Sequence, residues 1–415
     1  MTSRERVLAS LEHKQPDQIP VDFNGHSSSG ISVQAYRRLR EYLGLPQSPL
    51  YIYDVIQQLA IVEDDVLDLL GIDVFQLGCE YSRRPDYWQD WELHDGTRCK
   101  IPKHIPIHIN PNGDYEIYSP KGTLLGVQKK GCLYFEQCYF PFADSERDRF
   151  DDLSEYMSEF LWGYVTKPPA PTGLDAEGLK QRAQEAAQLR GSTTRAIYAN
   201  FGGKFFEPST YLYRMDNLMM NLALEPDAMH RLYDALLSLH LNALSLYLKA
   251  VGPYIDVLGI VGDDLGMQTG PLLSADMFRE FLKPRYKAMV DFVKQNYPHI
   301  KICMHSCGSI VQFLPDLIDL GIDAVNPVQI SCKGMDPKTL KQKFGDSITF
   351  WGGGCDTGYY LTQGTPEEIR RHVEENIRTF SPGGGFVFQQ VHNILANVPP
   401  QNIMAMMEAV NKFRA

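Results

Sequence analysis

The stretch of sequence from residue 300 to residue 328, IKICMHSCGSIVQFLPDLIDLGIDAVNPV, decides the fold. A short apolar run at 300–305 is followed by a helical pattern at 310–320, and a second apolar run follows at 323–328. Short apolar runs that alternate with amphipathic helical segments predict a parallel sheet built from strand–helix units. The quoted stretch is therefore expected to form one strand–helix–strand unit of such a sheet.

The same alternation continues over most of the chain. Strand candidates lie at 19–23, 72–77, 195–201, 254–262, 300–305, 323–328, 348–352 and 385–391, and helical patterns lie at 274–295, 310–320, 337–344 and 365–380. Ser274 and Thr365 each provide a hydroxyl group at the start of a helical pattern, and acidic residues follow in the first turn. Both features are typical of a helix start. Eight parallel strands with outer helices predict a (β/α)8 barrel, also called a TIM barrel, whose active sites lie at the C-terminal strand ends. We expect residues 1–415 to form one such barrel with an N-terminal helical segment.

Two stretches interrupt the alternation. Residues 91–142 contain repeated turn signals, such as Asp95-Gly96, between short alternating segments. This pattern predicts a β-meander that is inserted after the second strand and projects over the barrel mouth. The second stretch, TKPPAPTG at 166–173, predicts a stiff, exposed linker between two helical segments.

Composition and charge exclude several classes of protein. The chain has 415 residues, of which 44% are hydrophobic, and its net charge is −11. These are globular values, and the absence of a basic stripe argues against a nucleic-acid partner. The sequence has neither a run of about 18 apolar residues nor the apolar core of a signal peptide, so we expect no membrane span and a cytoplasmic location. Eight cysteines are too few for a disulfide framework, and clustered cysteines in a reducing compartment more often bind metal.

A candidate zinc site follows from three of these residues. His305 and Cys307 lie two positions apart at the end of the fifth strand candidate, so their side chains face the same side. Cys355 follows three glycines at the end of the seventh candidate, which places it on the same rim. Imidazole and thiolate are ligands that zinc prefers, and three protein ligands leave the open position of a catalytic site. The alternative for the pair is a buried cysteine beside a hydrogen-bonded histidine.

Polar residues also follow three other strand candidates. They are Asp22, Asn24 and His26 after the first strand, Asp263, Asp264 and Gln268 after the fourth, and Gln390, His392 and Asn393 after the last. Polar residues at C-terminal strand ends of a barrel are typical of catalysis or substrate binding. We expect Asp264 and His392 to be catalytic and the other seven to bind substrate. The structural alternative is a turn or helix cap for either aspartate and a hydrogen-bonded core histidine for His392.

Several motifs give the chain a family resemblance. They are Arg4-Glu-Arg-Val-Leu, Met304-His-Ser-Cys-Gly308, Asn326-Pro-Val-Gln, Gly364-Thr-Pro-Glu-Glu and His392-Asn-Ile-Leu-Ala-Asn. With them the chain resembles the uroporphyrinogen decarboxylase superfamily, in its branch of corrinoid-dependent (cobalamin) methyltransferases, over nearly its whole length. The resemblance implies a single (β/α)8 barrel. It also implies one catalytic Zn²⁺ held by an H-x-C pair and a later cysteine, and methyl exchange with the cobalt of a separate corrinoid protein.

The chain departs from this family in two places. In the coenzyme M methyltransferases of this branch the later cysteine belongs to the last strand, where this chain has His392. The resemblance therefore gives little support for coenzyme M as the methyl acceptor of this chain. Uroporphyrinogen decarboxylases have an arginine-rich segment after the first strand, whereas this chain reads NGHSSSG at 24–30. The carboxylates of a porphyrinogen substrate would be left unpaired there, which is costly if they are buried.

The resemblance therefore favours zinc-assisted methyl transfer, in the O-demethylating direction, from a small substrate such as a methoxylated aromatic to a corrinoid protein. Bound zinc would polarise the methoxy oxygen or hold an acceptor thiol as the thiolate. One alternative is a cofactor-free decarboxylase of the uroporphyrinogen type that uses Asp264 or Asp263. Another is a metal-binding or corrinoid-binding protein without turnover. The oligomeric state stays open, with a homodimer among the expectations.

Overall fold

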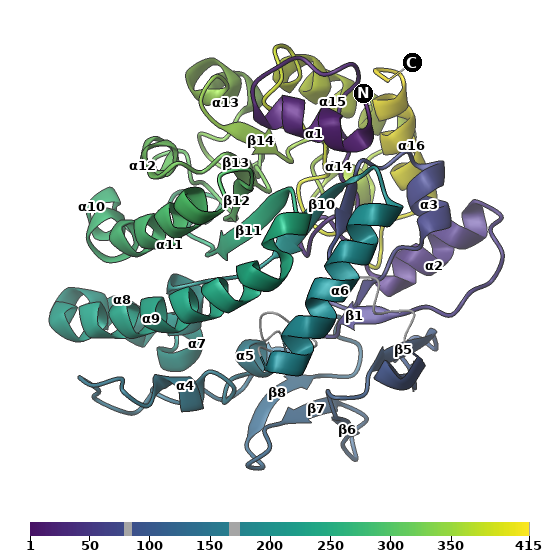
Figure 1. The fold of residues 1–415 in the computed structure, drawn as a ribbon. Coiled ribbons are helices and arrows are strands. Elements are labelled where there is room, and N and C mark those ends of the chain that lie inside the picture. Colours follow the sequence, from purple (N-terminus) through teal and green to yellow (C-terminus); the bar gives the residue numbers. More distant parts are fainter. Residues whose placement is uncertain (79–84, 166–174, 415) are drawn as a thin grey trace.

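A curled parallel sheet forms the centre of the molecule (Figure 1). The computed structural model describes residues 1–78, 85–165 and 175–414. Seven strands follow one another across the sheet in chain order: β3 (Val74–Gln76), β10 (Ala196–Asn200), β11 (Val257–Gly262), β12 (Lys301–His305), β13 (Ala324–Asn326), β14 (Thr349–Trp351) and β15 (Phe386–Val387). Each of these strands lies within a predicted strand.

The predicted first strand lies between the two edges of this sheet, but it forms only an isolated bridge between Val21 and Phe388. The N–H of Asp22 donates to the carbonyl of Phe388 at 2.8 Å, and the N–H of Asp73 donates to the carbonyl of Val21 at 2.8 Å. Pro20 has no N–H to donate, and the Val21 N–H donates to the Asp73 carboxylate instead of a strand carbonyl. The (β/α)8 arrangement is confirmed, with this segment reduced from a strand to a bridge.

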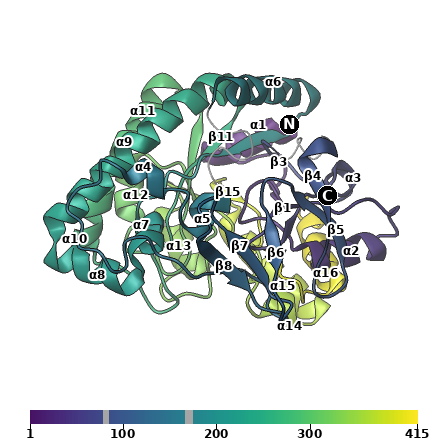
Figure 2. The same cartoon turned by 90° about the horizontal axis from the view of Figure 1, so that it is seen from below.

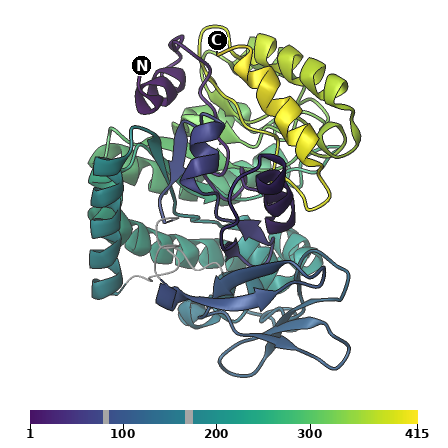
Figure 3. The ribbon, with the colours of Figure 1, turned by 90° about the vertical axis from the view of Figure 1, so that its right-hand side faces the viewer.

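Helices cover the outside of the sheet (Figures 1 and 3). The larger ones are α1 (Ser3–Leu11), α2 (Val33–Tyr42), α6 (Ala176–Ser192), α7 (Phe206–Tyr213), α8 (Met215–Leu224), α9 (Pro226–Val251), α11 (Lys283–Asn296), α12 (Leu314–Leu320), α13 (Pro337–Phe344), α15 (Pro366–Phe380) and α16 (Pro400–Asn411). The shorter ones are α3 (Asp64–Leu69), α4 (Leu153–Tyr156), α5 (Leu161–Val165), α10 (Ala275–Met277) and α14 (Tyr360–Gln363). Both predicted caps are present, because Ser274 accepts the Met277 N–H and Thr365 forms a capping box with Glu368.

Helix α9 is apolar and, with the turn that follows it, long enough to cross a membrane by length and composition alone. However, Leu232, Leu236 and Leu244 of this helix are fully buried inside the protein. A core helix of a globular protein passes the same test of length and composition, so α9 does not by itself indicate a membrane span.

Short antiparallel strands fill the stretch between β3 and the helices that precede β10. They form two sheets instead of one meander: β4 (Trp88–Glu92) with β5 (Arg98–Pro102), and β6 (Ile107–Ile109), β7 (Tyr115–Tyr118), β8 (Leu124–Gln128) and β9 (Glu136–Gln137). A separate hairpin joins β1 (Ile52–Asp54) to β2 (Leu59–Ala60). The four-stranded sheet lies at the end of the molecule opposite α1, nearest the viewer in Figure 2. The predicted linker at 166–173 lies outside the described residues.

Three aspartates that directly precede strands connect neighbouring segments at the N-terminal end of the barrel, where the strands begin. Each carboxylate accepts the N–H of a residue in the neighbouring segment at 2.7 to 2.9 Å, in the pairs Asp73–Val21, Asp256–Ile197 and Asp323–Ile302. Asp73 is almost fully buried and also accepts a hydrogen bond from Arg6 at 2.6 Å. A buried carboxylate is tolerated only with such partners, so these residues fix the order of the strands where they begin.

Replacing Asp73 with alanine would leave the Val21 N–H and one side of the Arg6 guanidinium without their buried acceptor. We expect Asp73→Ala to lower the free energy of unfolding by about 3–5 kcal/mol in urea denaturation. The control is Asp90→Ala, because the Asp90 carboxylate is 89% exposed in its pair with Lys100. That variant should lose less than about 1 kcal/mol, and equal losses in the two variants would contradict the structural role of Asp73.

Candidate metal centre

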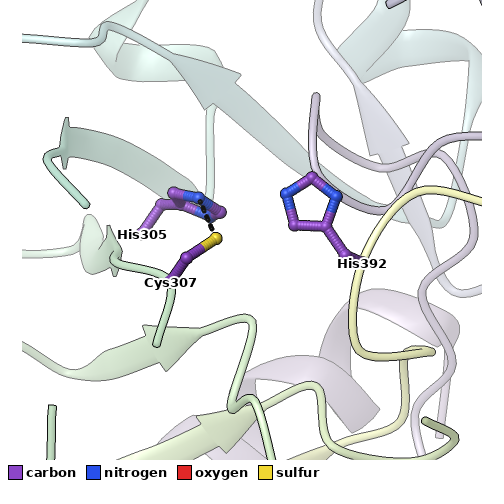
Figure 4. A group of neighbouring side chains, drawn as sticks. All are labelled: His305, Cys307 and His392. Atoms are coloured by element: carbon purple, nitrogen blue, oxygen red, sulfur yellow. Dashed lines mark hydrogen bonds between the residues drawn. The ribbon is translucent and has the colours of Figure 1, made fainter. Parts of the chain in front are cut away.

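Three side chains from two parts of the barrel rim meet in one group (Figure 4). His305 ends β12, Cys307 lies in the turn after it, and His392 lies in the loop after β15. One ligand atom of each residue lies within 4.8 Å of the others, and all three side chains are half-buried. The group supplies two imidazole nitrogens and one thiol sulfur, which are donors that zinc prefers.

The pair His305–Cys307 already has the spacing of two ligands on one ion. Its Nε2 and Sγ atoms lie 3.4 Å apart. A tetrahedral zinc with nitrogen at about 2.0–2.1 Å and sulfur at about 2.3 Å separates these two donors by about 3.5 Å. The residues present therefore fit a zinc ion.

Asn326, at the end of the adjacent strand β13, fixes the ring of His305. Its Oδ1 atom accepts a hydrogen bond from His305 Nδ1 at 2.8 Å. Its Nδ2 atom donates at 2.8 Å to both Trp351 O and Gln389 Oε1, which determines the orientation of the amide. Nδ1 of His305 therefore carries a proton. Burial opposes a charge on this ring, but Cys307 and Asp264 raise the pKa of His305 well above its usual value, so a metal has to displace the proton on Nε2 before this nitrogen can bind it. The motif that contains Asn326 is visible in the sequence, but this role was not predicted.

Asp264 lies against both members of the pair. Its Oδ1 atom accepts the Cys307 N–H at 2.8 Å and lies 3.4 Å from His305 Nε2. Burial opposes ionisation, but the hydrogen bond and charge of His305 hold the pKa of Asp264 well below its usual range. The carboxylate thus positions the turn that carries Cys307, and its 40% exposed side chain still faces the barrel mouth.

The electrostatics of His392 suit a ligand. Burial and the neighbouring charge of His305 lower the pKa of His392 to about 4. The ring is therefore neutral near neutral pH, as a metal-binding imidazole must be. Burial raises the pKa of the Cys307 thiol, whereas His305 lowers it, so binding of a metal has to displace the thiol proton.

Cys355, the predicted third ligand, is not a member of this group. It is fully buried in the main apolar core, and its Sγ atom contacts the carbonyl of Asp356 at 3.8 Å. Gly352 and Gly353 adopt positive φ angles of 126° and 73° and turn the chain after β14. The alternation of side chains along the strand therefore does not continue to Cys355, and the structure brings His392 into the group instead.

Asp263 occupies a capping position. Its carboxylate is fully buried and accepts the N–H groups of Phe205 and Glu207 at 2.8 Å each, together with the hydroxyl of Tyr286 at 2.6 Å. These bonds hold the start of α7 against the end of β11. The structure therefore favours the capping alternative over substrate binding for this aspartate.

The residues predicted after the first strand, Asp22, Asn24 and His26, are buried inside the protein. Asp22 accepts hydrogen bonds from Gly25 N at 2.7 Å and Trp351 Nε1 at 2.8 Å, and His26 Nε2 lies 3.1 Å from Asp22 Oδ2. Asn24 is buried in the same loop. The Oγ atom of Ser28 contacts Asn326 Oδ1 at 2.6 Å, so this loop supports the metal centre from within.

The remaining predicted substrate-binding residues have different surroundings. Gln390 is buried and donates to Ser29 O at 2.9 Å, and Asn393 accepts the Gly30 N–H at 2.7 Å. Both side chains tie the loop after β15 to the loop after the first strand. Gln268 is exposed on the rim.

Comparison with known proteins places these features in a family. A family model described as uroporphyrinogen decarboxylase (URO-D) matches residues 201–413, just over half of the chain. The chain belongs to the uroporphyrinogen decarboxylase family. The matched part of this URO-D family member contains β11 to β15 and all three residues of the candidate metal centre.

Curated relatives match a smaller part of this URO-D family member. The uroporphyrinogen decarboxylase of Chlorobium luteolum is 33% identical over 148 residues, which are 34% of this chain and 39% of that protein. The enzyme of the same name from Chlorobium limicola is 32% identical over 148 residues, with the same coverage. The chain thus matches about two fifths of the length of these relatives.

A solved structure covers the whole of this URO-D family member. A methyltransferase from Methanosarcina mazei matches 100% of both chains with a TM-score of 0.60 and 16% sequence identity. At this identity the match shows a shared fold alone.

The three residues of the group should determine zinc content. We expect Cys307→Ser and His392→Ala to weaken zinc binding strongly, because each removes a ligand, and Asn326→Ala to weaken it by about 10–100-fold, because the ring of His305 is no longer held. Competition with a chelator measures each affinity. The control is Cys355→Ser, which should keep the wild-type affinity. A loss in Cys355→Ser that equals the loss in His392→Ala would contradict the ligand set.

Proposed function

We propose that this chain is a zinc-dependent methyltransferase that moves a methyl group from a small methylated substrate to the cobalt of a corrinoid carried by a partner protein. The observation that carries the proposal is the group of His305, Cys307 and His392 at the C-terminal strand ends, with the His305 ring fixed by Asn326. Three protein ligands leave one position open, which is typical of a catalytic zinc rather than a structural one.

The ligand set favours an oxygen-linked methyl group. One thiolate and two neutral imidazoles would give Zn²⁺ and its ligands a net charge of +1, whereas the predicted set with two thiolates would be neutral. The Asp264 carboxylate lies beside this group but is not one of its three ligands. With only one thiolate ligand, a zinc ion held by His305, Cys307 and His392 would be a stronger Lewis acid than one with two thiolates, and it would stabilise negative charge on an oxygen that loses its methyl group. This supports the demethylating direction.

The chain's own residues prepare this site. Asn326 orients His305, Asp264 holds the turn that carries Cys307, and His392 stays neutral. Asp264 faces the mouth with part of its carboxylate, where it can accept a hydrogen bond from a substrate hydroxyl. The corrinoid partner, the cytoplasmic location and a homodimer stay predictions.

Decarboxylation of a uroporphyrinogen-type substrate is the second candidate, favoured by the names of the curated relatives. The segment between residues 22 and 30 has no arginine for the carboxylates of such a substrate. The side chains of Asp22, His26 and Ser29 in that segment are instead engaged in hydrogen bonds within the protein. These contacts argue against a highly charged substrate in this part of the barrel.

The test uses free cob(I)alamin as the methyl acceptor and 2-methoxyphenol as the methyl donor. We expect the zinc-loaded protein to form methylcobalamin, followed by its absorbance, and the chelated protein to form none while its circular dichroism stays unchanged. The barrel has its own large core, so zinc should supply chemistry more than stability. Loss of circular dichroism on chelation, or decarboxylation of uroporphyrinogen without zinc, would contradict the proposal.

A further inference from the structure

A partly buried ion pair lies beside the candidate metal centre. Lys204 follows β10, and Glu207 lies in the first turn of α7. The Lys204 Nζ atom contacts the Glu207 carboxylate, and the two side chains are only 33% and 15% exposed. No sequence motif points to either residue, because a lysine and a glutamate three positions apart are common on helix surfaces.

A single glycine separates this pair from the metal centre. Gly262 ends β11, the strand between β10 and β12. A methyl group on Gly262 would lie 3.3 Å from Lys204 Cε and 3.8 Å from His305 Cβ. Lys204 and His305 therefore approach the same point from two sides. The ion pair and the metal centre face the same C-terminal rim of the barrel.

Several charged and titratable groups surround Glu207. Lys204 precedes it, Tyr211 lies one turn further along α7, and Asp263 and Asp264 follow β11. Three further groups from other elements pack against these residues. His240 of α9 contacts the Lys204 carbonyl at 2.6 Å, Tyr286 of α11 donates to Asp263, and Asp54 of β1 interacts with Lys204.

These surroundings shift the pKa of Glu207. Burial raises it to about 7; Lys204 opposes this shift, and Asp263 and Asp264 add to it. A proton on Glu207 is thus exchangeable near neutral pH.

We propose that Glu207, positioned by Lys204, donates a proton to the substrate oxygen that loses its methyl group. The role rests on the proposed function and narrows its substrate class to methyl ethers. When a methyl ether loses its methyl group, the leaving group is an alkoxide or a phenolate, which takes up a proton. When a methylated ammonium compound loses its methyl group, the leaving group is a neutral amine, which needs no proton.

The step balances in atoms and electrons. The methyl–oxygen bond breaks with its electron pair on the oxygen, and the methyl group forms a bond with corrinoid cobalt(I), which supplies the pair for that bond. The oxygen takes the proton of the Glu207 carboxylic acid and becomes a hydroxyl. The Glu207 carboxylate that remains is stabilised by Lys204, and a proton from water restores the acid.

Difference infrared spectroscopy of the zinc-loaded protein tests the proton on Glu207 without any turnover. Between about pH 5 and about pH 9 the carboxylic acid C=O band of Glu207 should disappear with a midpoint near 7, because the acid form persists below its raised pKa. Glu207→Gln should lack this band. Glu280→Gln should keep it, since the Glu280 side chain is 52% exposed and pairs with His230. A wild-type spectrum without the band would overturn the proposal.

The leaving group tests the transfer of that proton. Glu207→Gln should slow methyl transfer from 2-methoxyphenol by about 10²-fold but barely slow transfer from 4-nitroanisole, whose phenolate leaves without a proton. Equal slowing of both donors would overturn only the role of Glu207. If the wild-type protein demethylates neither donor, the proposed function fails and this role fails with it.

Discussion

The hydrogen bond from His305 Nδ1 to Asn326 Oδ1 fixes the orientation of the imidazole ring and leaves Nε2 as the nitrogen that can bind a metal. Asn326 in turn donates to Trp351 O and Gln389 Oε1, so its amide joins β13 to β14 and to the end of β15. The same amide oxygen contacts Ser28 Oγ in the loop that closes the barrel. The metal centre is therefore preorganised by the strand ends themselves, and its geometry depends on the closure of the barrel.

The neighbours of two carboxyl groups on this rim shift their pKa values in opposite directions. Both Asp264 and Glu207 are disfavoured as anions by burial. Asp264 accepts a backbone N–H and faces His305, so its pKa falls, whereas Glu207 has two aspartates nearby that counteract Lys204, so its pKa rises. Neighbouring acids with separated pKa values are typical of sites where one group stays charged and another transfers a proton.

Hydrophobic periodicity was sufficient to predict the barrel, because the apolar strand runs are buried on both faces and the helices carry clear caps. It also placed His305, Cys307 and His392 at strand ends on one rim. It could not predict that His392 rather than Cys355 joins the pair, since Gly352 and Gly353 turn the chain between β14 and Cys355. Lys204 and Glu207 were missed because only the fold brings Lys204, the partner of Glu207, next to Gly262 and His305.

X-ray absorption at the zinc edge of the loaded protein tests the central claim most directly, because it counts the sulfur ligands. The account predicts one sulfur at about 2.3 Å and imidazole nitrogens at about 2.0–2.1 Å. The sulfur contribution should vanish in Cys307→Ser and stay unchanged in Cys355→Ser. Two sulfur ligands in the wild-type protein would contradict the centre formed by His305, Cys307 and His392.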